Sequence, residues 1–232
     1  MENLNDRSEE RLAVALALSA VGGFLDIYTY LFRGGVFANA ITGNIVLLGL
    51  RLAMREWAGA AKCLVAILAY SLGVLCAEVV GQMDRGGRGT ARHRGVLLAE
   101  SVLLLGVHLL PSALPDFLAN AAVAFVCALQ VQTFRRVAGL PFASTMCTGN
   151  MRSGSEELLL AVLRRETSHA VNSLRYFGVI LSFVLGAGGG SLLFMRFGPN
   201  VFLLAPLALF SVVLALRRWE SDASSPERAF AD

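Results

Sequence analysis

Long apolar runs with almost no charge are the feature that most constrains this chain. About 20 helical residues cross the roughly 30 Å hydrocarbon core of a bilayer, because a helix rises about 1.5 Å per residue. The runs therefore predict six transmembrane helices, separated by short polar or arginine-rich stretches. They cover Leu12–Phe32, Cys63–Gly81, Gly95–Leu110, Phe117–Val131, Tyr176–Met195 and Val201–Leu216.

The composition agrees with a membrane protein and argues against several other classes. Hydrophobic residues make up 56% of the 232 residues and charged residues only 16%, whereas a soluble domain has roughly 25% charged residues. The formal net charge of +3 is small, and the basic residues lie between apolar runs, so we expect no nucleic-acid binding. The four cysteines lie in or beside apolar segments without C-x-x-C spacing, and no nucleophile, metalloprotease or phosphate-binding motif occurs. We therefore expect neither an enzyme nor a bound cofactor or metal.

A repeated tripeptide, Thr-Gly-Asn, divides the chain into two similar units. It occurs at 42–44 and at 148–150, and each copy leads into an apolar run too short to cross a bilayer. The two copies are 106 positions apart (148 minus 42), and Tyr70 and Tyr176 have the same separation. A fixed separation of this kind indicates an internal repeat. The predicted boundaries are a polar tail at 1–11, one membrane domain at 12–217 with units at about 12–111 and 118–217, and a polar tail at 218–232.

The basic residues predict how the two units are oriented. If the short Thr-Gly-Asn segments do not cross, the arginine-rich loop 84–94 and three arginine pairs lie on the cytoplasmic side with both termini, as the positive-inside rule requires. If both segments cross, giving eight spans, that charge bias is lost. Three spans per unit then place the second unit upside down. The predicted fold is an all-α membrane protein with six transmembrane helices and two re-entrant half-helices in an inverted 3+3 repeat, a plan that recurs in transporters.

In this arrangement each Thr-Gly-Asn marks the tip of a re-entrant loop near the bilayer midplane. The threonines are predicted N-caps, the glycines allow close approach, and the asparagines offer both a donor and an acceptor. Two half-helix N-termini directed at one point favour a small polar or anionic solute. A purely structural tie between the units is the alternative. The candidate residues are Thr42, Gly43, Asn44, Thr148, Gly149 and Asn150.

Three further polar residues in the spans are candidates for solute contact. Asp26 lies inside the first span, Gln132 lies 106 positions later (132 minus 26), and Gln130 adds a third polar side chain. A carboxylate within a membrane is costly and marks a functional site by default. The alternative for Asp26 is a hydrogen bond to the re-entrant backbone, whose donors need partners. Glu100 and His108, eight positions apart on one helical face, form either a proton relay or ordinary packing contacts.

The stretches "GGFLDIYTYLFRGGVFANAITGNIVLLG" and "ALQVQTFRRVAGLPFASTMCTGNMRSGSEEL" resemble the two signature stretches of the YoaK family, small multi-pass bacterial inner-membrane proteins grouped under a domain of unknown function. The resemblance covers roughly 12–216. It implies location in the bacterial plasma (inner) membrane and supplies no substrate or reaction. From the residues we expect a transporter of a small polar or anionic solute. A channel with paired half-helices, a non-transporting scaffold or sensor, and a homo-oligomer are the open alternatives.

Overall fold

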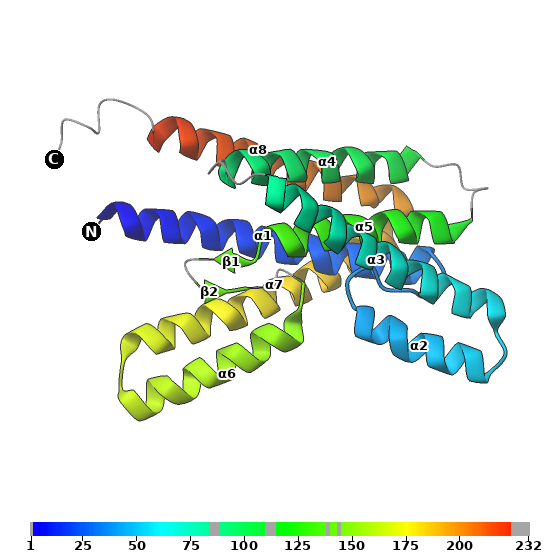
Figure 1. Ribbon diagram of the computed structural model, residues 1–232, viewed down its shortest axis with the longest axis horizontal. Helices are drawn as coiled ribbons and strands as arrows, with labels where there is room; N and C mark the ends of the chain where they lie inside the picture. Colours follow the sequence, from blue (N-terminus) through cyan, green and yellow to red (C-terminus); the bar gives the residue numbers. More distant parts are fainter. Residues whose placement is uncertain (1, 84–88, 110–114, 138–139, 143–144, 224–232) are drawn as a thin grey trace.

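The computed structural model describes residues 2–83, 89–109, 115–137, 140–142 and 145–223. In these ranges the chain is almost entirely helical, and its one β-structure is a two-residue antiparallel pair (Figure 1). The elements are α1 (Glu2–Phe32), α2 (Ile41–Ala53), α3 (Trp57–Met83), α4 (Gly89–Leu109), α5 (Asp116–Thr133), β1 (Arg136–Val137), β2 (Leu140–Pro141), α6 (Cys147–Arg164), α7 (Thr167–Phe197), the 3₁₀ helix η1 (Pro199–Leu203) and α8 (Leu204–Ala223).

Five helical stretches are long and apolar enough to cross a membrane, which indicates a multi-pass membrane protein. They are Leu12–Phe32, Trp57–Met83, Asp116–Thr133, Thr167–Phe197 and Pro199–Arg218. Five of the six predicted spans are therefore supported. The sixth, Gly95–Leu110, is helical as α4 up to Leu109. This helix does not belong to the set, because it also contains Arg92 and Arg94 in addition to Glu100. The helix also begins at Gly89, inside the predicted loop 84–94.

The helices run in opposite senses in the two halves of the chain. In Figure 1, α1 runs from the left end to the right, α3 returns to the left, and α4 runs to the right again, whereas α5, α7 and α8 follow the reverse directions. The short helices start in the middle of the molecule: α2 leads to the right end and α6 to the left end. Their first residues, Ile41 and Cys147, are 106 positions apart (147 minus 41).

The main helix pairs join one half of the chain to the other. The two most extensive contacts are α1 with α7 and α3 with α5, and each short helix packs on the long helix that follows it. α4 packs on α8 and α5. The largest buried core lies where α1, α4, α5 and α8 meet, and Leu18, Leu97, Val123 and Leu209 are fully buried there.

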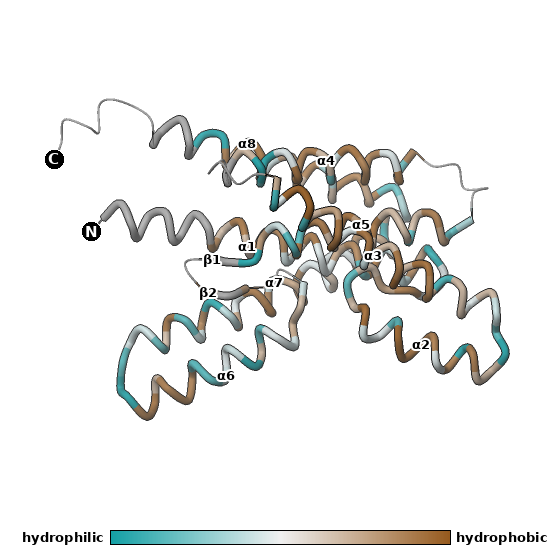
Figure 2. Tube along the Cα trace, viewed as in Figure 1, coloured by the Kyte–Doolittle hydropathy of each residue, from teal (hydrophilic) through white to brown (hydrophobic). Residues whose placement is uncertain are grey.

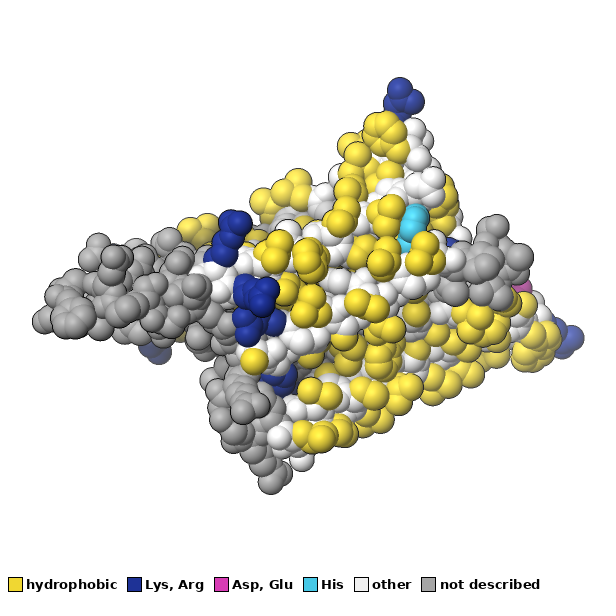
Figure 3. Space-filling view, turned by 90° about the horizontal axis from the view of Figure 1, so that it is seen from above, with side chains coloured by type: hydrophobic (Ala, Val, Ile, Leu, Met, Phe, Trp, Pro, Cys, Tyr) yellow, Lys and Arg dark blue, Asp and Glu magenta, His cyan; other side chains and the backbone are white. Residues whose placement is uncertain are grey.

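Glycines allow α1 and α7 to approach closely. A Cβ atom on Gly186 of α7 would overlap the carbonyl oxygen of Ala20, and one on Gly23 of α1 would overlap the carbonyl oxygen of Phe183. Backbones come this near only where small residues line the interface. The outer surface is mostly apolar, with Lys and Arg side chains toward the ends in the face drawn in Figure 3. Along α6, by contrast, hydrophilic residues alternate with apolar ones (Figure 2).

Candidate functional site

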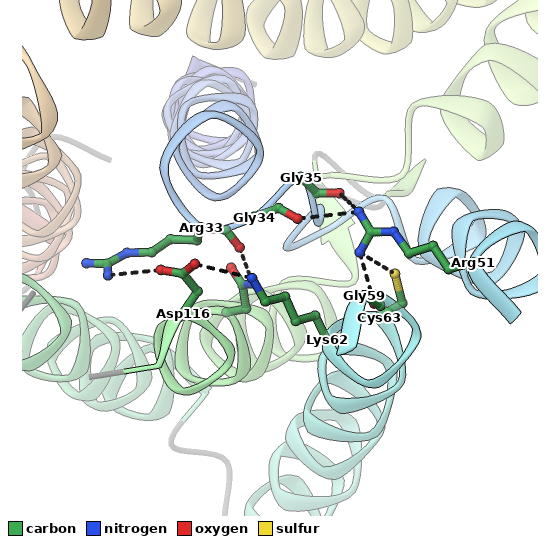
Figure 4. Close-up of polar contacts among 9 residues, drawn as sticks. Arg33, Gly34, Gly35, Arg51, Gly59, Lys62, Cys63 and Asp116 are labelled. Carbon is green, nitrogen blue, oxygen red and sulfur yellow. Dashed lines mark hydrogen bonds and ion pairs between the residues drawn. The ribbon is translucent and has the colours of Figure 1, made fainter. Parts of the chain in front are cut away.

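The segment between α1 and α2 turns back toward the middle of the molecule. Gly34 and Gly35 make the turn with φ values of +83° and +69°, a region that glycine occupies without steric cost. Arg51, at the far end of α2, holds this turn: its Nη2 donates to the Gly35 carbonyl oxygen at 3.3 Å and its Nη1 to the Gly59 carbonyl oxygen at 2.9 Å (Figure 4). The beginning of the segment and the end of the short helix are thus fixed together.

A second polar cluster lies beside this turn and joins α1, α3 and α5. Asp116 at the start of α5 lies 3.3 Å from Lys62 and 3.7 Å from Arg33, measured between charged atoms (Figure 4). Asn120 Nδ2 donates to the carbonyl oxygen of Arg33 at 2.7 Å. Ion pairs this exposed contribute little to stability by themselves. Together with the hydrogen bond from Asn120, these ion pairs hold the end of α1 in position at the point where the returning segment begins.

Asn44 holds the returning segment against the first turn of α2. Its Oδ1 accepts from the backbone N–H of Phe37 at 3.0 Å, and its Nδ2 donates to the carbonyl oxygen of the same residue at 2.6 Å. The side chain is fully buried. Because both ends of this amide are engaged by one backbone unit, the contacts favour a structural role for Asn44, which is one of the two alternatives weighed from the sequence.

Asp26 anchors the same segment to α1. Its Oδ1 accepts from the backbone N–H of Asn39 at 2.6 Å, and the side chain is buried. Asn39 Nδ2 donates to the carbonyl oxygen of Gly22, one turn earlier on α1, at 3.1 Å. The structural alternative for Asp26, a hydrogen bond to the returning backbone, is therefore present. The carboxylate also brings the side chain of Asn39 into the middle of the bundle.

The two returning segments meet over Gly22. A Cβ atom placed there would lie 3.4 Å from Thr145 Cβ, just before α6, and 3.6 Å from Asn39 Nδ2, just before α2. Asn39 and Thr145 are also 106 positions apart (145 minus 39), and each lies two residues before the start of a short helix. Both side chains are buried, and within the described ranges neither Asn39 Oδ1 nor Thr145 Oγ1 has a hydrogen-bond partner.

Two neighbouring buried side chains that each carry an unpartnered oxygen call for an explanation, because nearly all buried polar groups are hydrogen-bonded. Each such atom costs about 1–3 kcal/mol when it is left unsatisfied. A polar solute that binds here would satisfy both. We take Asn39, Thr145 and the adjacent Asp26 as the centre of the candidate site.

The predicted tip residues divide between this interior and the outer surface. Asn44 and Asn150 are buried, Gly43 is half-buried, and Thr42, Thr148 and Gly149 are exposed. The prediction that the two threonines cap their helices is wrong. Each is the second residue of its helix, the capping positions are Ala40 and Met146, and no side-chain cap bond forms at either.

The two predicted glutamines lie at different depths of the bundle. Gln130 is buried and its Nε2 donates to the carbonyl oxygen of Leu18 on α1 at 3.1 Å. Gln132 is half-buried, and its Nε2 donates to Glu78 of α3 at 2.7 Å. The 106-residue separation of Gln132 from Asp26 therefore does not predict its partner, which is Glu78. Asn39 and Thr145 were missed from the sequence, although the 106-residue spacing applied to the residues before each tripeptide pairs them.

Comparison with known proteins agrees with the resemblance seen in the sequence. A family model described as "Protein of unknown function (DUF1275)" matches residues 14–216. The chain belongs to this family. The match extends from within α1 to within α8 and includes Asp26, Asn39 and Thr145 of the candidate site. No curated protein and no solved structure matches the chain.

Proposed function

We propose that this DUF1275 protein is a membrane transporter in which two inverted units present re-entrant segments to one central site. The opposite helix directions in the two halves support the inversion (Figure 1). So does the exchange of partners, in which α1 of the first unit packs on α7 of the second and α5 of the second packs on α3 of the first. Inverted units of this kind carry their binding sites near the bilayer midplane.

Side-chain ties at equivalent positions give the inverted repeat further support. Arg51 Nη1 contacts Cys63 Sγ at 3.6 Å and links α2 to α3. Glu157 Oε2 contacts His169 Nδ1 at 2.7 Å and links α6 to α7. Each pair is shifted by 106 positions from the other (157 minus 51, and 169 minus 63). The chemistry differs while the location is the same, as expected for units that have diverged from one plan.

The observation that carries the transport proposal is that Asn39, which Asp26 holds by its backbone N–H, and Thr145 each have a buried oxygen without a partner among the described residues. Native proteins leave few buried polar groups unsatisfied, and a binding site for a polar solute accounts for two of them on neighbouring side chains. An amide oxygen accepts hydrogen bonds, a hydroxyl accepts or donates, and the neighbouring carboxylate repels anions. We therefore favour a small polar solute that carries hydrogen-bond donors over an anion.

Cysteine labelling tests the inverted arrangement. In a background without the four native cysteines, Arg55→Cys, between α2 and α3, and Arg164→Cys, before α7, are expected to react with a membrane-impermeant thiol reagent from opposite sides of the membrane. The two turns lie at opposite ends of the molecule in Figure 1. Intact cells and inside-out vesicles report the two sides separately. Labelling of both cysteines from one side would refute the inversion.

Thr145→Val tests the central site, because valine matches the shape of threonine and lacks its hydroxyl. A panel of urea, glycerol, neutral amino acids, ammonium and phosphate is screened by thermal shift and by swelling of proteoliposomes. The solute that stabilises the wild type is expected to bind about two- to tenfold more weakly to the variant, since one hydrogen bond is worth about 0.5–1.5 kcal/mol. The matched control is Thr42→Val, at an exposed threonine. Equal swelling of wild-type, Thr145→Val and protein-free vesicles across the panel would contradict transport.

A further inference from the structure

Glu100 occupies the centre of the buried face of α4. Leu97, Glu100 and Leu104 are fully buried, and Val107 is nearly so. Steps of three and four residues put these side chains on one stripe of a helix. α4 directs such a stripe toward α8 and α5, the helices on which it packs. A carboxyl group therefore lies where the pattern otherwise places only aliphatic side chains.

This carboxyl has no partner among the residues that the structure describes. Both Oε1 and Oε2 are buried without a hydrogen bond. On α5, which packs on α4, the buried titratable side chain is Cys127. The adjoining part of α8, 204–216, and η1 contain no titratable side chain. On α4 itself, Arg92 and His108 are each two helical turns away, and the His108 ring stacks on Phe202.

An ionised carboxylate without a cation or a donor is very costly in such surroundings, and the group takes up a proton instead. We propose that Glu100 is a proton-binding site of the membrane domain: its carboxyl, enclosed where α4 packs on α5 and α8, holds a proton at neutral pH. Buried acidic side chains of this kind form proton relays in pumps and transporters. The position equivalent to Glu100 in the second unit is Pro206 (206 minus 100), so the repeat itself does not require an acid here.

Infrared spectroscopy of the purified protein in lipid tests the proposal without any solute, so the result does not depend on the transport proposal. The wild type at neutral pH is expected to show the carbonyl stretch of a protonated carboxylic acid that is missing from Glu100→Gln. Glutamine resembles the protonated acid in size and lack of charge, so this variant is expected to fold. Asp26→Asn removes another buried carboxyl group and serves as the matched control, in which the Glu100 band must persist.

Transfer to D₂O then measures access of water to the site. The band is expected to shift to its deuterated position more slowly than the amide signals of exposed segments, because the proton exchanges only when the helices around Glu100 separate. Glu100→Asp, which keeps an acid, is expected to keep a band of this kind. Identical carboxylic-acid regions in wild type and Glu100→Gln would overturn the proposal, since Glu100 would then be ionised. Immediate exchange of the band would overturn it as well.

Discussion

Gly186→Ala is expected to destabilise the protein more than any other single methyl addition proposed for it. The new Cβ would overlap the carbonyl oxygen of Ala20, and the Ala20 carbonyl carbon would lie at 2.6 Å. These atoms belong to the backbone of α1 and cannot rotate away, so α1 and α7 must separate. Overpacking costs about 1–3 kcal/mol, and we expect the upper end of that range. For a chain of this length it corresponds to a fall in Tm of about 6–12 °C.

Thermal unfolding in a detergent or nanodisc measures this effect, and the same helix offers its own controls. A Cβ atom on Gly188 or Gly189 would meet nothing within 4 Å. Gly188→Ala and Gly189→Ala are therefore expected to leave Tm unchanged or to raise it slightly, because alanine favours a helix by about 1 kcal/mol over glycine. If the Tm of Gly186→Ala changes no more than the Tm of these two variants, the backbones of α1 and α7 do not lie in such close contact.

Asp26→Ala is expected to release the returning segment between α1 and α2. The substitution leaves the backbone N–H of Asn39 buried without the acceptor that now lies 2.6 Å away. Such a loss costs about 1–3 kcal/mol. Amide hydrogen exchange in residues 33–40 is expected to accelerate, because the Asp26 anchor no longer holds the segment. Any solute identified with the Thr145→Val experiment is expected to bind more weakly as well, since Asn39 loses its fixed position.

Asp26→Asn is the matched control for this prediction. The asparagine oxygen can accept the same hydrogen bond, so exchange in 33–40 is expected to stay near the wild-type rate. Solute binding in this variant separates the two roles of Asp26. Retained binding would assign the carboxylate to positioning alone, and lost binding would add a direct contact with the solute. Unchanged exchange in Asp26→Ala would show that the carboxylate does not anchor the segment.

The sequence predicted the helices well and the side-chain chemistry of the central region less well. Hydropathy is averaged over many residues, so five of the predicted spans are supported, and α4 differs because two arginines and Glu100 lie within it. Helices α2 and α6 each start one residue before their Thr-Gly-Asn tripeptide. The cap assignment was wrong because an offset of one or two residues at a helix start moves a threonine from the cap to the outer face.

Asn39 and Thr145 were missed because an internal repeat is recognised in a sequence by identical residues. Thr-Gly-Asn attracts notice as an exact match, whereas Asn39 and Thr145 share only a position and a polar character. Their meeting over Gly22 depends on how the two segments fold back, which no local pattern encodes. Gln132 shows the reverse case. It has the right spacing from Asp26, but it reaches Glu78 because α5 presents that face to α3.

The pairing of α1 with α7 and of α5 with α3 also bears on how the protein is made. Helix α1 finds its principal neighbour, α7, only after α2 to α6 have been synthesised, whereas α5 meets α3 soon after it emerges. During that interval the glycine-lined side of α1 is in lipid or in the insertion machinery. Truncation before α7 would leave this helix without its main contact, so biogenesis depends on the late arrival of a single segment.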